Sequence, residues 1–364
     1  MPQFNIILNR IIDKALKLNA SYIHLEPSSK PAVRISFELN SLEDEDIISE
    51  DFLNQFAKNI LSESEQKILG DKKSITVVRG FESGIRFKVQ IFYQKNKISA
   101  ILGYIPTKIK TPEELQLSQQ FSNLIKKPKG MLVVSGLHGA GKTATAVSLL
   151  NLVNQTEKKY ILTLEDPVEY ALNSERSIIE QRQIGRDADN YIDSIKFALE
   201  SDVDIVFISK LTSYKVLEQI INLIDSGRLV VVIVEAGSAP EAIEKIIDLA
   251  PAAETEKLKN IIAELLIGVV VQQIMPRRGG GQVFATEILI LNEAARSLIK
   301  EGRYSQIISI IQTSKDDGMQ TLDQSLAELV RTGEIEQQDA LQVAIDKVEL
   351  QSSIHKNTKK SNFN

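Results

Sequence analysis

The sequence predicts an α/β protein of two domains, in which a smaller α+β domain precedes a larger domain with a mainly parallel sheet. Three observations lead to this fold class. The chain has 364 residues, more than a single hydrophobic core usually organises. Short strand-like runs rich in β-branched and aromatic residues dominate its first third. From residue 131 onward, apolar strands alternate with helical stretches, which is typical of a sheet covered by helices on both faces.

The first 105 residues carry the signals of an antiparallel sheet joined by helices. The chain opens with a stretch in which Ile7, Ile11 and Ile12 recur at helical spacing, as on an amphipathic surface helix. A second helix is expected over residues 49–69. We assign residues 1–105 to an N-terminal α+β domain. Its expected strands are 22–27, 32–39, 74–78, 85–93 and 98–105.

Two prolines in PTKIKTPEE mark the start of a linker and connecting helix over residues 106–126. Residues 127–350 then carry the alternating pattern of the larger domain, and 268–291 predicts two strands around a glycine turn. Amphipathic helices follow, and the polar tail 351–364 is expected to be disordered. The expected parallel strands are 131–135, 160–164, 204–208 and 229–234.

Composition excludes several functional classes. The net charge of −5 argues against nucleic acid as a partner, because such surfaces need a clear basic excess. The chain has no cysteine, which removes disulfides, thiolate nucleophiles and cysteine-ligated metals. No segment approaches the roughly 20 apolar residues that a membrane span needs, so we expect no direct membrane insertion.

Residues 135–146, SGLHGAGKTATA, contain the phosphate-binding pattern G-x-x-x-x-G-K-[ST] between a buried strand and a helix. Glycines let successive backbone N–H groups point at phosphate oxygens, and the lysine is a point charge for the outer phosphates. The hydroxyl of Thr143 can reach Mg²⁺. The sequence therefore predicts a site for ATP and Mg²⁺. The candidate nucleotide-binding residues are Gly136, Gly139, Ala140, Gly141, Lys142, Thr143 and Ala144.

Two further segments carry candidate site residues. In LEDPVEY, Glu165 or Asp166 can hold Mg²⁺ or orient water, because strand ends are where α/β sheets present ligand-binding groups; the alternative is an Asp that caps a helix. In QRQIGRD, Arg182 and Arg186 can contact phosphate or a neighbouring subunit, and the alternative is a solvated or salt-bridged pair.

Taken together and in order, these motifs resemble those of the PilT-type secretion ATPases of the type IV pilus retraction branch. The resemblance spans about residues 5–345. ASYIHLEP resembles the family's opening ASD-x-H-L, GLHGAGKT its phosphate loop, LEDPVE its acidic box and QRQIGRD its arginine-bearing segment. EAARSLIKEG and GMQTLDQSL resemble the C-terminal helices of its retraction-type members.

The resemblance implies a RecA-like ATPase core behind a PAS-like N-terminal domain. It implies a six-membered ring, either homomeric or mixed with an active paralogue, that docks on the pilus platform protein. The expected location is the cytoplasm, peripheral to the inner membrane through that partner. It also implies that Arg86, Arg182 and Arg186 contact phosphate or a neighbouring subunit.

Several positions depart from the family's pattern. The Walker B strand of the family ends in Gly-Glu, whereas DIVFI is followed here by Ser209 and Lys210. Arg228 and Glu235 replace both histidines of the family's His box, and Gly103 replaces an arginine. Lys210 and Glu235 are expected at neighbouring strand ends, where their opposite charges suggest an ion pair; the alternative is that each turns to solvent.

These departures separate nucleotide binding from hydrolysis. A positioned general base contributes on the order of 10²–10⁴ in rate, and a lysine beside phosphate keeps its proton and cannot act as one. The sequence therefore predicts a nucleotide-binding protein with impaired or absent ATP hydrolysis that acts as an accessory or regulatory ring subunit. The alternative is an active retraction motor in which Glu165 serves catalysis.

Overall fold

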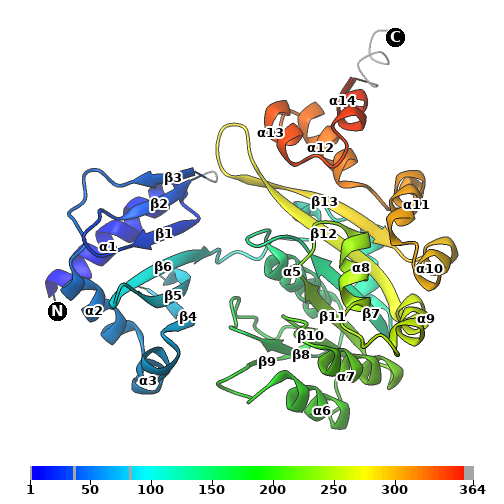
Figure 1. Ribbon diagram of the computed structural model, residues 1–364, viewed down its shortest axis with the longest axis horizontal. Coiled ribbons are helices and arrows are strands. Elements are labelled where there is room, and N and C mark those ends of the chain that lie inside the picture. Colours follow the sequence, from blue (N-terminus) through cyan, green and yellow to red (C-terminus); the bar gives the residue numbers. More distant parts are fainter. Residues whose placement is uncertain (1, 36–37, 82–83, 356–364) are drawn as a thin grey trace. The chain divides into compact units, whose positions relative to one another are not determined.

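The computed structural model describes residues 2–35, 38–81 and 84–355. The chain divides into two compact units, residues 1–108 and 109–364, here called the N-terminal and C-terminal units (Figure 1). The boundary follows Lys108. Most of the expected linker therefore belongs to the C-terminal unit.

An antiparallel sheet forms the centre of the N-terminal unit, as the sequence predicts. Along residues 86–92 every second side chain is buried, as with Phe87, Val89 and Ile91. These side chains join one core with the apolar faces of the helices. In sheet order the strands are β3 (Glu38–Ser41), β2 (Ala32–Ile35), β1 (Tyr22–Leu25), β6 (Lys97–Ile105), β5 (Arg86–Gln94) and β4 (Ser74–Gly80), and the helices are α1 (Pro2–Lys17), α2 (Glu50–Ile60) and α3 (Glu63–Lys72).

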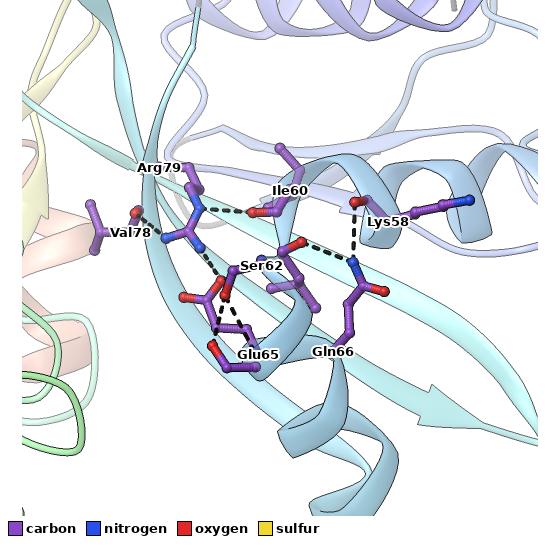
Figure 2. A network of polar contacts seen from close by, with 9 residues as sticks. Lys58, Ile60, Ser62, Glu65, Gln66, Val78 and Arg79 are labelled. Atoms are coloured by element: carbon purple, nitrogen blue, oxygen red, sulfur yellow. Dashed lines mark hydrogen bonds and ion pairs between the residues drawn. The ribbon is translucent and has the colours of Figure 1, made fainter.

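The single helix expected over 49–69 is two helices, and Figure 2 shows why the chain breaks between them. The Ser62 hydroxyl accepts a hydrogen bond from the Glu65 backbone N–H, and the Glu65 carboxylate accepts one from the Ser62 N–H at 2.8 Å. This capping box starts a new helix. Arg79 on β4 donates to the Ile60 carbonyl at 2.8 Å and pairs with Glu65, which fixes the break against the sheet.

The sheet of the C-terminal unit is parallel except for one edge strand. Every residue of its central strands is buried, because helices cover both faces. In sheet order the described strands are β13 (Gln282–Ile290), β12 (Leu266–Pro276), β7 (Gly130–Ser135), β11 (Leu229–Val234), β10 (Ile205–Ile208), β8 (Tyr160–Glu165) and β9 (Ile178–Gln183). The edge strand β9 is not among the strands that the sequence predicts.

Alternating side chains of β7 divide the interior into two cores. Met131 and Val133 pack with one set of helices, while Leu132 and Val134 pack with α5 and the segment that precedes β7. A third cluster joins β12 and β13 to the last helices. The α-helices are α4 (Gln119–Ser122), α5 (Lys142–Thr156), α6 (Tyr191–Glu200), α7 (Tyr214–Asp225), α8 (Ala239–Ile247), α9 (Thr255–Leu265), α10 (Glu293–Lys300), α11 (Ile307–Thr313), α12 (Leu322–Arg331), α13 (Gln337–Val343) and α14 (Lys347–His355).

Two boundary predictions need correction. The connecting helix expected before residue 126 is instead a series of short 3-10 and α-helical turns. Phe121 and Ile125 in this segment are fully buried in the C-terminal unit. The disordered tail is expected from residue 351, but this start is too early, because α14 continues to His355. Leu350 is fully buried and Ile354 packs on the same cluster, so this turn has an apolar face. Residues 356–364 lie outside the described residues.

Candidate functional site

The site lies where parallel strands end side by side. The strands run in the order β7, β11, β10, β8, so the residues that follow them form a row along one edge of the sheet. Val234, at the end of β11, pairs with Ser135, at the end of β7. Glu235 therefore lies level with the first residue of the phosphate loop. At about 4.8 Å per strand, the end of β8 is roughly 14 Å from that of β7.

The phosphate loop connects β7 to α5 as the motif predicts. Gly136 has a φ of 149°, in the range that favours glycine. A Cβ atom there would lie 2.6 Å from the Gln272 carbonyl oxygen, so only glycine fits between the loop and β12. Lys142 and Thr143 open α5, and the free backbone N–H groups at the start of a helix can bind an anion. The loop thus has the form that a polyphosphate needs.

Gln272 on β12 shapes the loop, and sequence reasoning missed it. Its side chain is buried, and its amide donates to the Ala140 carbonyl at 2.9 Å. The Thr145 hydroxyl on α5 donates to the Gln272 amide oxygen. One buried amide therefore joins the loop, the helix after it and the neighbouring strand. In the sequence Gln272 shows only as one of two adjacent glutamines in a largely apolar strand.

Lys142 is held by oxygen atoms on three sides. Its ammonium donates to the carbonyls of Gly136 at 3.1 Å and Leu137 at 2.9 Å. It also lies 3.4 Å from Oε1 of Glu235. The expected ion pair between Lys210 and Glu235 is therefore wrong. β11 lies directly beside β7, which brings Glu235 to the loop lysine, and exposed Lys210 makes no ion pair within the described part of the chain.

The end of β10 carries a hydroxyl and an ammonium. The Ser209 hydroxyl accepts a hydrogen bond from the Asp166 backbone N–H at 3.1 Å and shares one with the Tyr191 hydroxyl at 3.0 Å. Burial raises the pKa of Tyr191 to about 12; the bond with Ser209 opposes this shift, and the charges of Asp166 and Glu165 add to it. Tyr191 therefore stays protonated at neutral pH.

Glu165 ends β8 with a fully buried side chain. Its carboxylate accepts from the Thr163 hydroxyl at 2.6 Å and from the Gln181 amide at 3.0 Å. The structure therefore places it within a hydrogen-bonded network, three strands from the phosphate loop. The next residue, Asp166, is exposed. No helix follows it within the described segment 166–177, so the helix-capping alternative is wrong.

Arg182 and Arg186 line one surface hollow of about 330 Å³, as their spacing suggests. The Arg182 guanidinium lies 4.8 Å from the centre of the Phe197 ring and donates to the Asp187 carbonyl at 2.9 Å. The Arg186 Nε lies 4.0 Å from the Asp187 carboxylate, and its side chain is 71% exposed. Within one chain Arg182 is half-buried against Phe197, and Arg186 is exposed and salt-bridged to Asp187.

The other two departures, Arg228 and Gly103, lie in different units of the chain, and Arg86 keeps the arginine of the family. Arg228 precedes β11, at the opposite end from Glu235, where its guanidinium donates to the Leu199 and Ser201 carbonyls at the end of α6. Arg86 starts β5 in the N-terminal unit. Gly103 on β6 lies opposite Tyr22, and a Cβ atom at Gly103 would come within 2.9 Å of the tyrosine ring.

Comparisons with known proteins agree with this geometry. Residues 107–280 match the family model described as Type II/IV secretion system protein. The chain is 28% identical over 337 residues to the type IV pilus retractation ATPase PilT of Pseudomonas aeruginosa, covering 93% of this chain and 98% of that protein. It is 30% identical over 257 residues to the type IV pilus ATPase PilU of the same organism, covering 70% of this chain and 67% of that protein.

Solved structures extend the similarity to the fold. The structure titled as the pilus retraction motor PilT and bound ADP matches with a TM-score of 0.79 at 32% identity, covering 94% of this chain and 98% of that one. The Legionella pneumophila ATPase DotB matches with a TM-score of 0.79 at 18% identity, covering 93% and 95%. The predicted α/β fold, an ATPase core behind an N-terminal sheet domain, is confirmed. The chain belongs to the PilT-type ATPase family of type II/IV secretion system proteins.

Proposed function

We propose that this chain is a nucleotide-binding PilT-type protein of the type IV pilus machinery in which ATP hydrolysis is impaired or absent. The observation that carries the proposal is the end of β10, where Ser209 and Lys210 follow the strand. A family glutamate at this place would activate the attacking water. Lysine supplies no base there, and the loss of a positioned general base lowers a rate by roughly 10²–10⁴.

Binding rests on different residues, and these are all present. The loop backbone has its phosphate-cradling form, Lys142 lies across the loop, and Thr143 lies in the first turn of α5. Thr143 would contribute its hydroxyl to Mg²⁺, which in such sites screens the phosphate charge. The bound ADP in the related PilT structure supports a nucleotide at this loop. The nucleotide would be held by Gly136, Gly139, Ala140, Gly141, Lys142, Thr143 and Ala144.

A working pilus motor is the second candidate. Glu165 is a poor catalytic base for such a motor, because its carboxylate is buried and already accepts two hydrogen bonds. Glu235 favours it more, since its carboxylate lies 3.4 Å from the phosphate-loop lysine. A carboxylate so close to the outer phosphates could orient water in place of the family glutamate.

The role in the cell follows from family membership and is likewise proposed. The chain would act as an accessory or regulatory subunit of a homo-hexamer or of a ring mixed with an active paralogue. The ring would dock on the pilus platform protein, in the cytoplasm and peripheral to the inner membrane. Arg86, Arg182 and Arg186 would contact phosphate or the neighbouring subunit. None of the described helices is both long and apolar enough to span a bilayer.

Binding and hydrolysis measured on one preparation test the proposal. Fluorescent-nucleotide titration should show Mg²⁺-dependent binding that Lys142→Ala abolishes. Steady-state phosphate release should not exceed that of the same variant. Release well above Lys142→Ala, and lost in Glu235→Gln, would instead establish the second candidate.

A further inference from the structure

The contact between Lys142 and Glu235 bears on which nucleotide the site accepts. Lys142 is the loop residue that reaches the outer phosphates, whereas loop backbone N–H groups cradle the inner ones. Here its ammonium already has two carbonyl oxygens at 3.1 and 2.9 Å and a carboxylate oxygen at 3.4 Å. A carboxylate therefore already contacts the ammonium that would receive a terminal phosphate.

We infer that Glu235 is a specificity-determining residue that disfavours a nucleoside triphosphate relative to a diphosphate. The inference rests on the proposed nucleotide site. A diphosphate places its β-phosphate in the backbone cradle, where Lys142 also reaches it, and brings no γ-phosphate toward the Glu235 carboxylate. A triphosphate brings a further charged phosphoryl group to that lysine and to the carboxylate. Repulsion between like charges a few ångströms apart in a partly hydrated site corresponds to roughly five- to tenfold in affinity.

The surrounding groups fit this reading. The Glu235 side chain is 68% exposed, and the ion pair with Lys142 joins it to the phosphate loop. Its backbone carbonyl accepts from Lys245 at 2.8 Å, which holds the residue at the end of β11. Exposed Lys210, at the end of the adjacent strand, adds positive charge to the same edge. It therefore limits the discrimination to a moderate factor and does not abolish triphosphate binding.

The test compares the ratio of two dissociation constants. Affinities for ADP and for the β,γ-imido analogue of ATP, both with Mg²⁺, are measured by calorimetry on the full chain. Glu235→Gln should shift the ratio toward the triphosphate by roughly five- to tenfold. Glu218→Gln is the matched control, because it removes one negative charge from an exposed position on α7 that is not on the strand-end row.

An unchanged ratio in Glu235→Gln, with binding intact, would overturn the inference and leave the proposed function standing. A shifted ratio together with phosphate release above the Lys142→Ala level would support the inference while contradicting impaired hydrolysis. Failure of the wild-type chain to bind either nucleotide would overturn both. Because Glu235 is mostly exposed, its substitution should not unfold the chain, and a thermal melt checks this.

Discussion

Lys210 is the residue at which this chain departs most clearly from the PilT-type motif, which has a glutamate here. Its ammonium is exposed at the end of β10 and makes no ion pair with the described residues. The two hydrogen bonds at Ser209 fix the backbone that carries it. A side chain placed here is therefore well positioned, and its chemistry decides what the site can do.

Lys210→Glu should raise phosphate release, since it places a carboxylate, which can accept a proton from water, at the end of β10. We expect a gain well short of the 10²–10⁴ that a general base can contribute, because Gly103 and Glu235 keep their altered chemistry. A coupled phosphate assay measures the change, with Lys210→Gln as the control for loss of charge alone. Recovery of the full factor would show that the other departures do not limit hydrolysis.

Glu287 on β13 is a second charged residue in an unusual place. Its side chain is fully buried, and its Oε1 atom accepts a hydrogen bond at 2.6 Å from the backbone N–H of Ala239, the first residue of α8. Burial raises its pKa to about 7; the backbone N–H groups of Ala239 and Leu322 oppose the shift, and Asp323 adds to it. The protonated form is thus favoured in the fold.

The raised pKa of Glu287 predicts a pH-dependent stability. The protonated carboxyl contributes fully below the unfolded pKa near 4.5, and this contribution is lost as the pH rises toward 7. Glutamine does not titrate, so Glu287→Gln should not show this loss of stability. The free energy of unfolding of the variant, relative to that of the wild type, should therefore rise between pH 5 and pH 8, by roughly 3 kcal/mol at most. Urea unfolding at several pH values measures this. Parallel pH profiles for the wild type and the variant would contradict it, and Glu218→Gln should leave the profile unchanged.

At the scale of elements, the pair β1–β6 shows how one departure is built into the sheet. Tyr22 lies directly across from Gly103, and the aromatic ring occupies the space that a side chain at Gly103 would need. An aromatic residue over a cross-strand glycine covers backbone that the glycine leaves bare. Restoring the arginine of the family at this position therefore requires Tyr22 to move.

Gly103→Arg should destabilise the chain by about 1–3 kcal/mol, the usual range for overpacking. In a Tyr22→Ser background the same substitution should be much milder, because the obstructing ring is absent. A double-mutant cycle from urea unfolding gives the coupling between the two positions. Additive effects would mean that the ring does not oppose the new side chain.

Local patterns in the sequence predict what is local in the structure. The strand, glycine loop and helix of the phosphate site are confirmed because fewer than 30 consecutive residues encode them. The contact between Lys142 and Glu235 joins positions 93 apart, and that between Thr145 and Gln272 positions 127 apart. Both depend on strand order, which periodicity does not give. Strand β9 escapes prediction because its run IIEQRQ is too polar for a buried strand.

At the scale of the whole molecule, family membership predicts a ring. Two-fold dimers are the commoner assembly of soluble proteins, so this prediction rests on the relatives and not on general frequency. Light scattering with Mg²⁺ and ATP should give a mass of six chains. If the assembly depends on nucleotide, Lys142→Ala should weaken that dependence. A single-chain mass at every concentration would contradict the homomeric ring and favour a mixed one.

The hairpin of β12 and β13 has a mechanical consequence. At one point Gln272 joins it to the phosphate loop. Past the end of β12, Arg277 and Arg278 form two-pronged pairs with Glu334 and Glu336, which follow α12. Between these points the two strands are continuously paired. The hairpin therefore forms a stiff connection about 15–20 Å long. Any widening of the loop around a phosphate would be transmitted along it, and the last helices would move with the loop.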